Sequence, residues 1–154
     1  MLTEKIKKLL MAREFVYVAT ANPDGKPNAA PKFLVKVEQN FIYLIDYVSG
    51  KTWENIKVNP RASISFIDNE TLTGYQVNGP VDLISSGPEF NEIIDEVQEK
   101  QLSLTVERIV KGVQRGKKHS NFEVALPENG VVLKMKMEEI VEISPTGKLQ
   151  REKT

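Results

Sequence analysis

The sequence predicts a mainly β fold in which six or seven antiparallel strands close into a barrel with peripheral helices. Runs of strand length alternate apolar and polar residues, most clearly over Arg61 to Asp68, where Ala62, Ile64 and Phe66 share one face. Turn sequences such as Asn22-Pro23-Asp24-Gly25 separate these runs and indicate hairpins. With 154 residues, 40% of them hydrophobic, the chain can form one domain with its own core.

The overall composition argues against several classes of function. Lysine plus arginine and aspartate plus glutamate number 21 each, so no net field would attract a nucleic acid. The chain has no cysteine, which excludes a disulfide, a thiolate nucleophile and a cysteine metal site. With a single histidine as well, we expect no metal site.

The N-terminal segment predicts a short amphipathic helix. We expect this helix to cover an end of the barrel and not to lie on a membrane. Charged residues interrupt MLTEKIKKLLMAREF, and no run approaches the roughly 20 apolar residues of a membrane-spanning helix. The sequence therefore predicts a cytoplasmic protein without a membrane partner. The apolar face of the helix comprises Leu2, Ile6, Leu9 and Leu10.

The first two strands form a hairpin around the Asn22–Gly25 turn. They run from Phe15 to Ala21 and from Lys26 to Val37. Pro27 and Pro31 lack the amide proton that a sheet ladder uses, so they indicate an edge, a bulge or an irregular backbone in the second strand.

The stretch from Phe41 to Ile67 carries the strongest chemical signal. A strand, Phe41 to Tyr47, is joined by Ser49-Gly50-Lys51-Thr52 to a short helix that ends at Asn59-Pro60. An anion at this turn would meet unpaired amides of the helix N-terminus, two hydroxyls and one ammonium group. We interpret the turn as a phosphate cradle. It is not a P-loop, because position 45 is isoleucine where that motif has glycine. The alternative is an ordinary strand-to-helix turn in which Ser49 or Thr52 caps the helix.

The second half of the chain adds strands and helices. The strand from Thr73 to Ser85 contains Asn78-Gly79-Pro80, which indicates a bulge or a bend. Gly87-Pro88 begins a helix with Phe90, Ile93, Ile94 and Val97 on its buried face. A second helical pattern, with Val106, Ile109, Val110 and Val113, ends at Gly116.

The C-terminal part predicts a further hairpin and a tail. Strands from Asn121 to Leu126 and from Val131 to Ile143 flank the Pro127–Gly130 turn. Pro145 to Thr154 is charged and is expected to be frayed. These features predict a single domain over residues 1–154, with its core over about 14–144.

A basic run that ends at the lone histidine follows the second helical pattern. It is expected to be a solvated helix end, because cations are favoured there; the alternative is a second phosphate site, such as one for a nicotinamide nucleotide. Histidine is the residue type that titrates near neutrality, so His119 is a candidate proton donor. The run comprises Arg108, Lys111 and Arg115 on the outer face of the helical pattern, and then Lys117, Lys118 and His119.

Three stretches, in this order, resemble the FMN-binding split-barrel superfamily of the pyridoxamine 5′-phosphate oxidase type. They are VYVATANPDGKPNAAPKFLVK, FIYLIDYVSGKTWENIKVNPRASISFI and YQVNGPVDLI. The resemblance covers about residues 14–90 and is most similar in kind to small FMN-binding proteins. The order and spacing of the hairpin, the Ser-Lys turn, the Asn-Pro-Arg-Ala-Ser element and the V-x-G strand carry it.

The resemblance implies FMN as the cofactor and a homodimer with two equivalent FMN sites at the subunit interface. Lys32 would lie near N1 and the C2 oxygen of the flavin, where a cation favours the anionic reduced form. Position 50 departs from the oxidase pattern, which has arginine before the lysine, so one cationic phosphate partner is lost. The implied contacts are Pro31, Lys32, Phe33 and Leu34 along the flavin; Ile45 and Asp46 at the ribityl chain and ring; Ser49, Gly50, Lys51 and Thr52 at the phosphate; and Gln76, with Tyr75 and Asn78, from the second subunit.

The resemblance further implies a flavin-dependent oxidoreductase that acts on a small substrate. One alternative is a non-catalytic FMN-binding electron carrier that faces a redox partner. Another is a haem-binding or other ligand-binding module, in which His119 would be the only possible histidine axial ligand. The deazaflavin F420 could also replace FMN. A true pyridoxamine 5′-phosphate oxidase is not expected, because the chain has no C-terminal arginine-x-histidine element.

Overall fold

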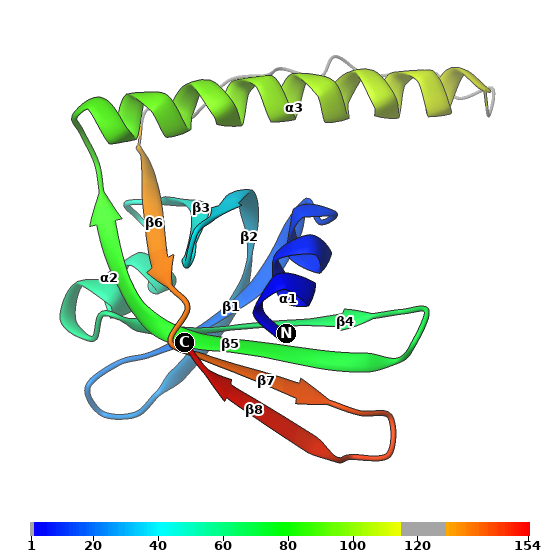
Figure 1. Cartoon of the computed structure of the whole chain (residues 1–154). Helices are drawn as coiled ribbons and strands as arrows, with labels where there is room; N and C mark the ends of the chain where they lie inside the picture. Colours follow the sequence, from blue (N-terminus) through cyan, green and yellow to red (C-terminus); the bar gives the residue numbers. More distant parts are fainter. Residues whose placement is uncertain (1, 115–128) are drawn as a thin grey trace.

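A closed antiparallel barrel of six strands forms the body of the protein in a computed structural model that describes residues 2–114 and 129–154 (Figure 1). The strand order is β4-β1-β2-β3-β6-β5, and pairing of β4 with β5 closes the barrel. Two further strands, β7 and β8, extend the sheet from β5. The predicted antiparallel split barrel is therefore confirmed. The barrel strands are β1 (Phe15–Ala21), β2 (Pro27–Glu38), β3 (Phe41–Tyr47), β4 (Arg61–Asp68), β5 (Thr73–Ile84) and β6 (Gly130–Lys136).

The interior of the barrel is apolar over most of its length. Alternate residues of each strand point inward, as the period of two requires. The helix α1 (Leu2–Met11) closes one end of the barrel with Leu2, Ile6 and Leu10, all of them buried. The predicted role of this helix is thus confirmed. Inward residues of the strands that pack in this core include Val16, Val18, Leu34, Ile42, Leu44, Ile64, Val77, Leu133 and Met135.

The helix α2 (Lys51–Val58) closes the opposite end. β2 begins beside α2, where the side-chain amide of Asn28 contacts the Thr52 hydroxyl, and ends beside α1, where Val37 lies against Met11. Ile56 is 1% exposed, so α2 presents its own apolar residue to the barrel interior. The two helices therefore fill the two open ends of one barrel.

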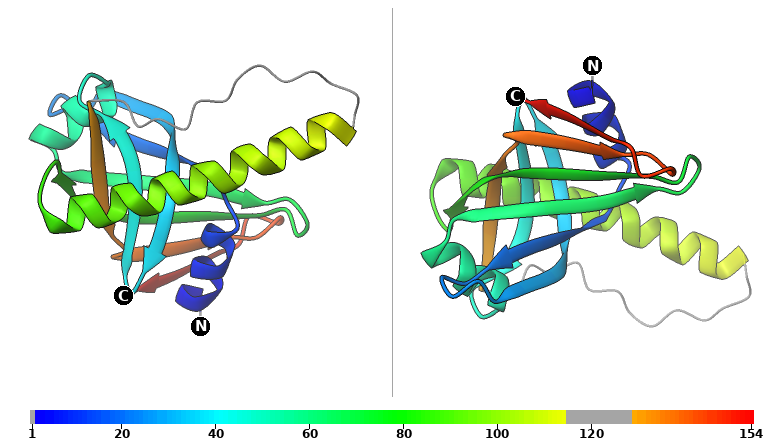
Figure 2. Two further views of the ribbon diagram at one scale, coloured as in Figure 1. Left: turned by 90° about the horizontal axis from the view of Figure 1, so that it is seen from above. Right: turned by 90° about the horizontal axis from the view of Figure 1, so that it is seen from below.

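A single long helix, α3 (Pro88–Gln114), lies across the outside of the barrel (Figures 1 and 2). Two separate helical patterns were predicted here. The observed helix is continuous because no glycine or proline interrupts residues 89–111. Its first part packs on β2, β3 and β6 in a second apolar cluster that contains Phe33, Ile45, Ile93, Val97 and Val132.

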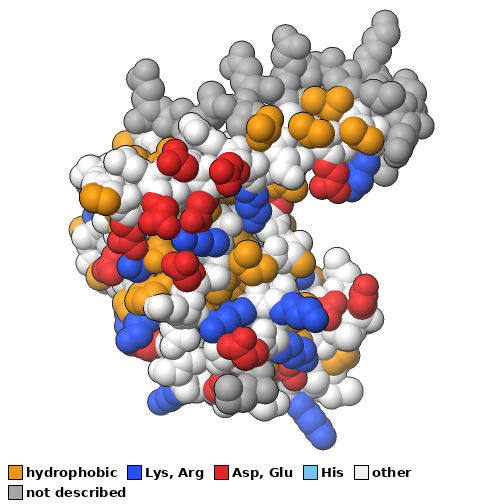
Figure 3. Space-filling view, turned by 45° about the horizontal axis from the view of Figure 1, so that its top comes forward, with side chains coloured by type: hydrophobic (Ala, Val, Ile, Leu, Met, Phe, Trp, Pro, Cys, Tyr) orange, Lys and Arg blue, Asp and Glu red, His pale blue; other side chains and the backbone are white. Residues whose placement is uncertain are grey.

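The second part of α3 extends past the barrel and carries exposed hydrophobic side chains (Figure 3). Leu102 is 56% exposed and Val106 is 52% exposed. Among the residues described, no helix is long and apolar enough to cross a membrane.

The C-terminal segment differs from its prediction in two ways. The predicted strand from Val131 to Ile143 is two strands, β6 and β7 (Glu139–Ile143), because its pairing with β5 is interrupted after Lys136: β6 pairs with Val81–Ile84, and β7 pairs with Gly74–Asn78 in a register shifted by one residue. The expected frayed tail is wrong, since β8 (Leu149–Lys153) pairs with β7 and its Glu152 accepts a hydrogen bond from Thr3 of α1 at 2.6 Å. The predicted strand over 121–126, and the part of the basic run over 115–119 with His119, lie outside the described residues. The first two residues of the basic run, Arg108 and Lys111, pair with Glu14 and Glu107.

Gly79 lies between the part of β5 that pairs with β7 and the part that pairs with β6, and the expected bend at Asn78-Gly79-Pro80 has a steric reason. A methyl group at Gly79 would come within 1.8 Å of the carbonyl oxygen of Lys136. Only glycine lets the two backbones approach this closely.

We predict that Gly79→Ala lowers the free energy of unfolding by about 3 kcal/mol, because backbone atoms must move to admit the methyl group. Gly74→Ala is the matched control, since its methyl group would make an ordinary contact of 3.5 Å with the Ile143 side chain. Urea denaturation of both variants measures the difference. Equal stability of the two variants would contradict this packing account.

Candidate functional site

The barrel interior changes from apolar to polar at the end that α2 closes. Along each strand the inward positions pass from Val18 to Thr20, from Leu34 to Lys32 and from Leu44 to Asp46. α2 meets these groups with polar side chains of its own: Asn55 donates to the Thr20 hydroxyl at 3.0 Å, and both residues are buried. These hydrogen bonds replace water for groups that would otherwise be costly to bury.

A buried ion pair lies at the centre of this polar end. Lys32 donates to Asp46 Oδ1 at 2.6 Å, and their side chains are 12% and 1% exposed. The second carboxylate oxygen, Oδ2, is buried and has no hydrogen-bond partner in the part of the chain that the structure describes. The lysine that the resemblance implies as a flavin-facing cation is thus already neutralised by an internal carboxylate. This pairing could not be inferred from the sequence, because the two residues lie on different strands.

The N-terminus of α2 is open to a ligand. Gly50 is its N-cap, with an ordinary extended backbone (φ −93°, ψ 164°), and no side chain makes a capping hydrogen bond. Neither Ser49 nor Thr52 caps the helix, contrary to the alternative drawn from the sequence. Within residues 2–114 and 129–154, the first amides of the helix therefore lack a side-chain cap and are candidates to bind an anion.

A pocket of about 240 Å³ opens beside this helix N-terminus. Lys51 and Asn55 of α2 line one side of the pocket, and Lys26, Pro27 and Asn28 at the start of β2 line another. Sequence reasoning identified Lys51 but missed Lys26 and Asn28. The signal was available in the Asp-Gly-Lys-Pro turn, but only the tertiary structure brings that turn to α2.

Lys51 also has a partner within its own helix. Its ammonium group contacts Glu54 at 2.9 Å, and both side chains are more than half exposed. The hydrogen bond from Lys51 lowers the pKa of the Glu54 carboxyl below its ordinary value. An exposed pair of this kind is weak, so Lys51 can exchange it for a bound anion at little cost.

The predicted site residues do not share one surface. Leu34 lies in the barrel core, whereas Phe33 and Ile45 lie in the cluster beneath α3. Pro31 is exposed on the outer face of β2, and Gln76 is half-buried on β5. The side chains of Pro31 to Leu34 therefore cannot all face one ligand.

The backbone of β2 offers a different kind of contact. β2 pairs with β1 over residues 27–33 but with β3 only from Phe33 onward. Between Asn28 and Lys32 the edge of β2 on the β3 side is unpaired within the described part of the chain. This open edge explains how Pro27 and Pro31 are tolerated, and it leaves backbone polar groups beside the pocket.

The outer face of the barrel opposite α3 carries exposed apolar side chains. Figure 2 (right) shows β1, β4, β5, β7 and β8 in front, with α1 and α3 behind them. Pairing places Tyr17 beside Ser65, and Ser65 beside Gln76, in one row across three strands. Tyr17 is 63% exposed and Ile67 is 46% exposed on this face.

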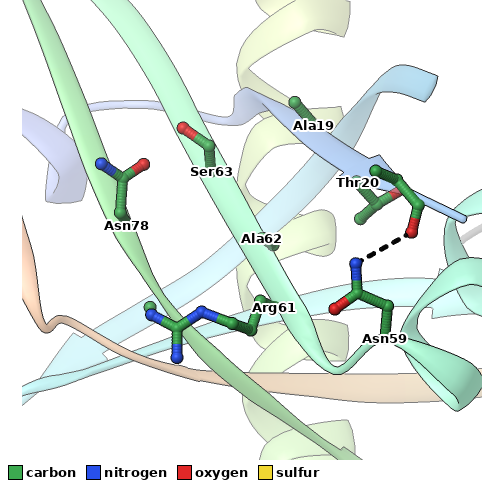
Figure 4. A pocket seen from close by; sticks show the side chains of 9 residues that line it. Ala19, Thr20, Asn59, Arg61, Ala62, Ser63 and Asn78 are labelled. Atoms are coloured by element: carbon green, nitrogen blue, oxygen red, sulfur yellow. Dashed lines mark hydrogen bonds between the residues drawn. The ribbon is translucent and has the colours of Figure 1, made fainter. Parts of the chain in front are cut away.

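Two hollows mark this outer face. One, of about 360 Å³, lies between Tyr17, Ile67, Gln76 and Ile143. Another, of about 400 Å³, lies near Arg61, with Ala19, Ser63 and Asn78 on neighbouring strands (Figure 4). In this second hollow Asn59 donates to the backbone carbonyl of Ala21 at 3.2 Å, which ties the end of α2 to β1.

The fold is a six-stranded split barrel with a candidate anion site at one end. The chain belongs to the pyridoxamine 5′-phosphate oxidase family, whose model matches residues 2–142. This result confirms the superfamily that the sequence motifs indicated.

Two curated relatives match part of the chain. An uncharacterized protein of Methanocaldococcus jannaschii is 33% identical over 99 residues, which are 62% of this chain and 64% of that protein. Heme oxygenase HutZ of Vibrio cholerae is 30% identical over 70 residues, 46% of this chain and 39% of HutZ. The chain thus spans less than two thirds of the length of both curated relatives.

A crystal structure shares the fold. It is a pyridoxamine 5′-phosphate oxidase-related, FMN-binding protein of Nostoc punctiforme, with a TM-score of 0.60 at 15% identity. The likeness covers 96% of this chain and 91% of that one, and at this identity it shows the fold alone.

We predict that Lys32→Met lowers the free energy of unfolding by about 3–5 kcal/mol, because it leaves the Asp46 charge buried without a partner. The double variant Lys32→Met/Asp46→Leu removes both charges and should recover most of this loss. Urea denaturation of the wild type, both single variants and the double variant gives the coupling. A cost below about 1 kcal/mol for Lys32→Met would show that the pair behaves like an exposed one.

Proposed function

We propose that this protein binds FMN, with the flavin phosphate at the N-terminus of α2. The observation that carries the proposal is the open helix N-terminus beside a pocket with two lysines, Lys26 and Lys51. Helix amides and the helix dipole favour an anion at this place, and each lysine adds a charge-assisted hydrogen bond. Ser49 and the Thr52 hydroxyl are the further candidate ligands.

The remainder of the cofactor would lie outside this pocket. A volume of about 240 Å³ is below the range of roughly 300–1,000 Å³ that whole small-molecule sites occupy, so the pocket suits the phosphate end alone. The open edge of β2 between Asn28 and Lys32 offers backbone groups for the polar edge of a flavin ring. When bound, the flavin would supply one- or two-electron redox chemistry, while the chain supplies anchoring and the local electrostatic environment.

We further propose that the chain forms a homodimer through the outer face of β1, β4, β5 and β7. Support comes from the exposed Tyr17 and Ile67 on a face that no described helix covers. A second copy would also cover a cofactor that one barrel leaves exposed, and Gln76 would then approach it from the partner subunit.

A flavin-dependent oxidoreductase acting on a small substrate is the activity that we propose for the FMN-loaded protein. The alternative is a non-catalytic electron carrier. Steady oxidation of a reduced nicotinamide cofactor by the loaded protein, with added small electron acceptors, would support the enzyme. Flavin that is reduced and reoxidised only by a protein redox partner would support the carrier.

Haem binding is the second candidate function. Its support is the 30% identity to heme oxygenase HutZ over 70 residues. His119 is the only histidine of the chain, so it would have to be any histidine axial ligand. A Soret band that appears on titration with haem and is lost in His119→Ala would favour this function, and so would the absence of any flavin binding.

We predict that the purified protein shows flavin absorption, or acquires it with about one FMN per chain. Titration that quenches flavin fluorescence should give a tighter dissociation constant for FMN than for riboflavin, which lacks the phosphate. A colourless protein that binds neither would overturn the proposal.

Lys51→Ala should weaken FMN binding by about 1.5–3 kcal/mol, the scale of one charge-assisted hydrogen bond, and should leave riboflavin binding unchanged. Lys57→Ala is the matched control, because Lys57 lies at the far end of the same helix, 3.8 Å from the centre of the Trp53 ring. Unchanged FMN affinity in Lys51→Ala would refute the cradle.

Tyr17→Glu should convert the dimer to a monomer, because it introduces a charge at the centre of the outer face. Sedimentation velocity over a range of concentrations measures the state. Leu102→Glu, which alters an exposed residue on α3 on the other side of the barrel, should leave the dimer intact. A Tyr17→Glu protein that sediments like the wild type would exclude this face as the interface.

A further inference from the structure

A fully buried carboxylate lies directly behind the proposed phosphate cradle. Asp46 is 0% exposed, and its Oδ1 is 4.0 Å from the position that a Cβ atom would take at Gly50, the N-cap of α2. The same oxygen accepts the hydrogen bond from Lys32, and Oδ2 has no partner. The carboxylate therefore sits at the positive end of the helix that would bind the ligand.

Asp46 and a bound anion would compete for the same positive groups. The helix N-terminus attracts both, and Lys32 can direct its ammonium group to only one of them at full strength. Burial makes this competition strong, because a buried charge is screened much less by water and salt than an exposed one.

The other carboxylate of the cradle has a weaker effect. Glu54 contacts Lys51, but both side chains are more than half exposed, so solvent screens that charge. Asp46 is buried, so its field is screened much less than that of Glu54.

We propose that Asp46 sets the charge preference of the cradle: it holds Lys32 in the barrel end and disfavours a dianionic phosphate. This inference rests on the proposed function and names Asp46 as a residue that determines specificity. With Asp46 present, the site accepts an anion by means of Lys26, Lys51 and the helix amides alone. Asp46 thus lowers the affinity of the site for phosphate esters. This effect adds to the loss of a cationic phosphate partner at position 50, which is glycine.

The test is Asp46→Asn, which keeps the shape of the side chain and an oxygen acceptor for Lys32 but removes the charge. Dissociation constants for FMN and for riboflavin are measured by quenching of flavin fluorescence in the wild type and in the variant. The ratio of the two constants isolates the phosphate contribution. We expect the preference for FMN over riboflavin to rise roughly tenfold, equivalent to about 1.4 kcal/mol.

Asp82→Asn is the charge-matched control, because Asp82 is exposed on β5 and is paired in register with Lys134, away from the cradle. It should leave the ratio unchanged. A ratio that is also unchanged in Asp46→Asn would overturn the inference, and so would equal gains for FMN and riboflavin, which would indicate a general change in the fold.

The double variant Lys32→Met/Asp46→Asn keeps the test decisive if Asp46→Asn alone folds poorly. If Asp46 holds Lys32 away from the ligand, losing both groups leaves the FMN preference at or above that of the wild type. A preference below that of the wild type would mean that Lys32 itself binds the phosphate, against the inference.

The outcomes separate this inference from the proposed function. A wild type that binds no FMN, beside an Asp46→Asn protein that does, would refute FMN as the native ligand while supporting the role of Asp46. A wild type that binds FMN, with an unchanged ratio in Asp46→Asn, would support FMN as the ligand and refute the role of Asp46. No flavin binding by either protein would refute both.

Discussion

A closed six-stranded barrel has two open ends, and its interior can be dry only if other elements fill them. Here α1 fills one end with Leu2, Ile6 and Leu10, so that end is a continuation of the apolar core. α2 fills the other with Thr52, Asn55 and Ile56, and the strand residues that face it are polar. The first end stabilises the fold by burying apolar surface, whereas the second must satisfy every polar group that it buries.

The need for satisfied hydrogen bonds fixes the position of α2. Asn55 binds Thr20 of β1, Asn59 binds the carbonyl of Ala21, and Thr52 meets Asn28 of β2. These contacts hold the helix with its N-terminus, free of any side-chain cap, beside the pocket. At this end of the barrel, Asp46 Oδ2 is buried without a hydrogen-bond partner among the described residues, a costly feature that stability alone would not favour. Stability and the candidate site therefore depend on the same few side chains.

The strand β2 serves three surfaces in turn. Its first residues pair with β1 alone and border the pocket, and Phe33 then enters the cluster under α3. A bulge between Leu34 and Lys36 lets Val35 join that cluster while Val37 returns to the barrel core. The cover that α3 gives to one side of the barrel leaves the opposite side as the exposed apolar face. This exposed apolar face is the surface that we propose as the homodimer interface.

The sequence by itself determined the class of fold, the order and approximate limits of β1 to β5, the helix that covers the first barrel end and the turn at Ser49 to Thr52. These features follow from local patterns. Alternation, turn residues and helical periodicity each involve only a few neighbouring residues, so they can be recognised in the sequence alone. The same locality explains two errors. The tail at Leu149 to Lys153 is a strand only because β7 offers it an edge, and α3 is one helix because nothing breaks it.

Only the tertiary structure decided which side chains meet. Lys26 and Asn28 reach α2 because barrel closure brings the first hairpin to that helix, and Lys32 meets Asp46 because β2 and β3 both point these residues into the same barrel end. No local pattern encodes such pairs, since their separation along the chain reflects strand register and closure. The sequence could therefore locate a candidate anion-binding turn. That the buried Asp46 carboxylate lies next to this turn could be seen only in the folded barrel.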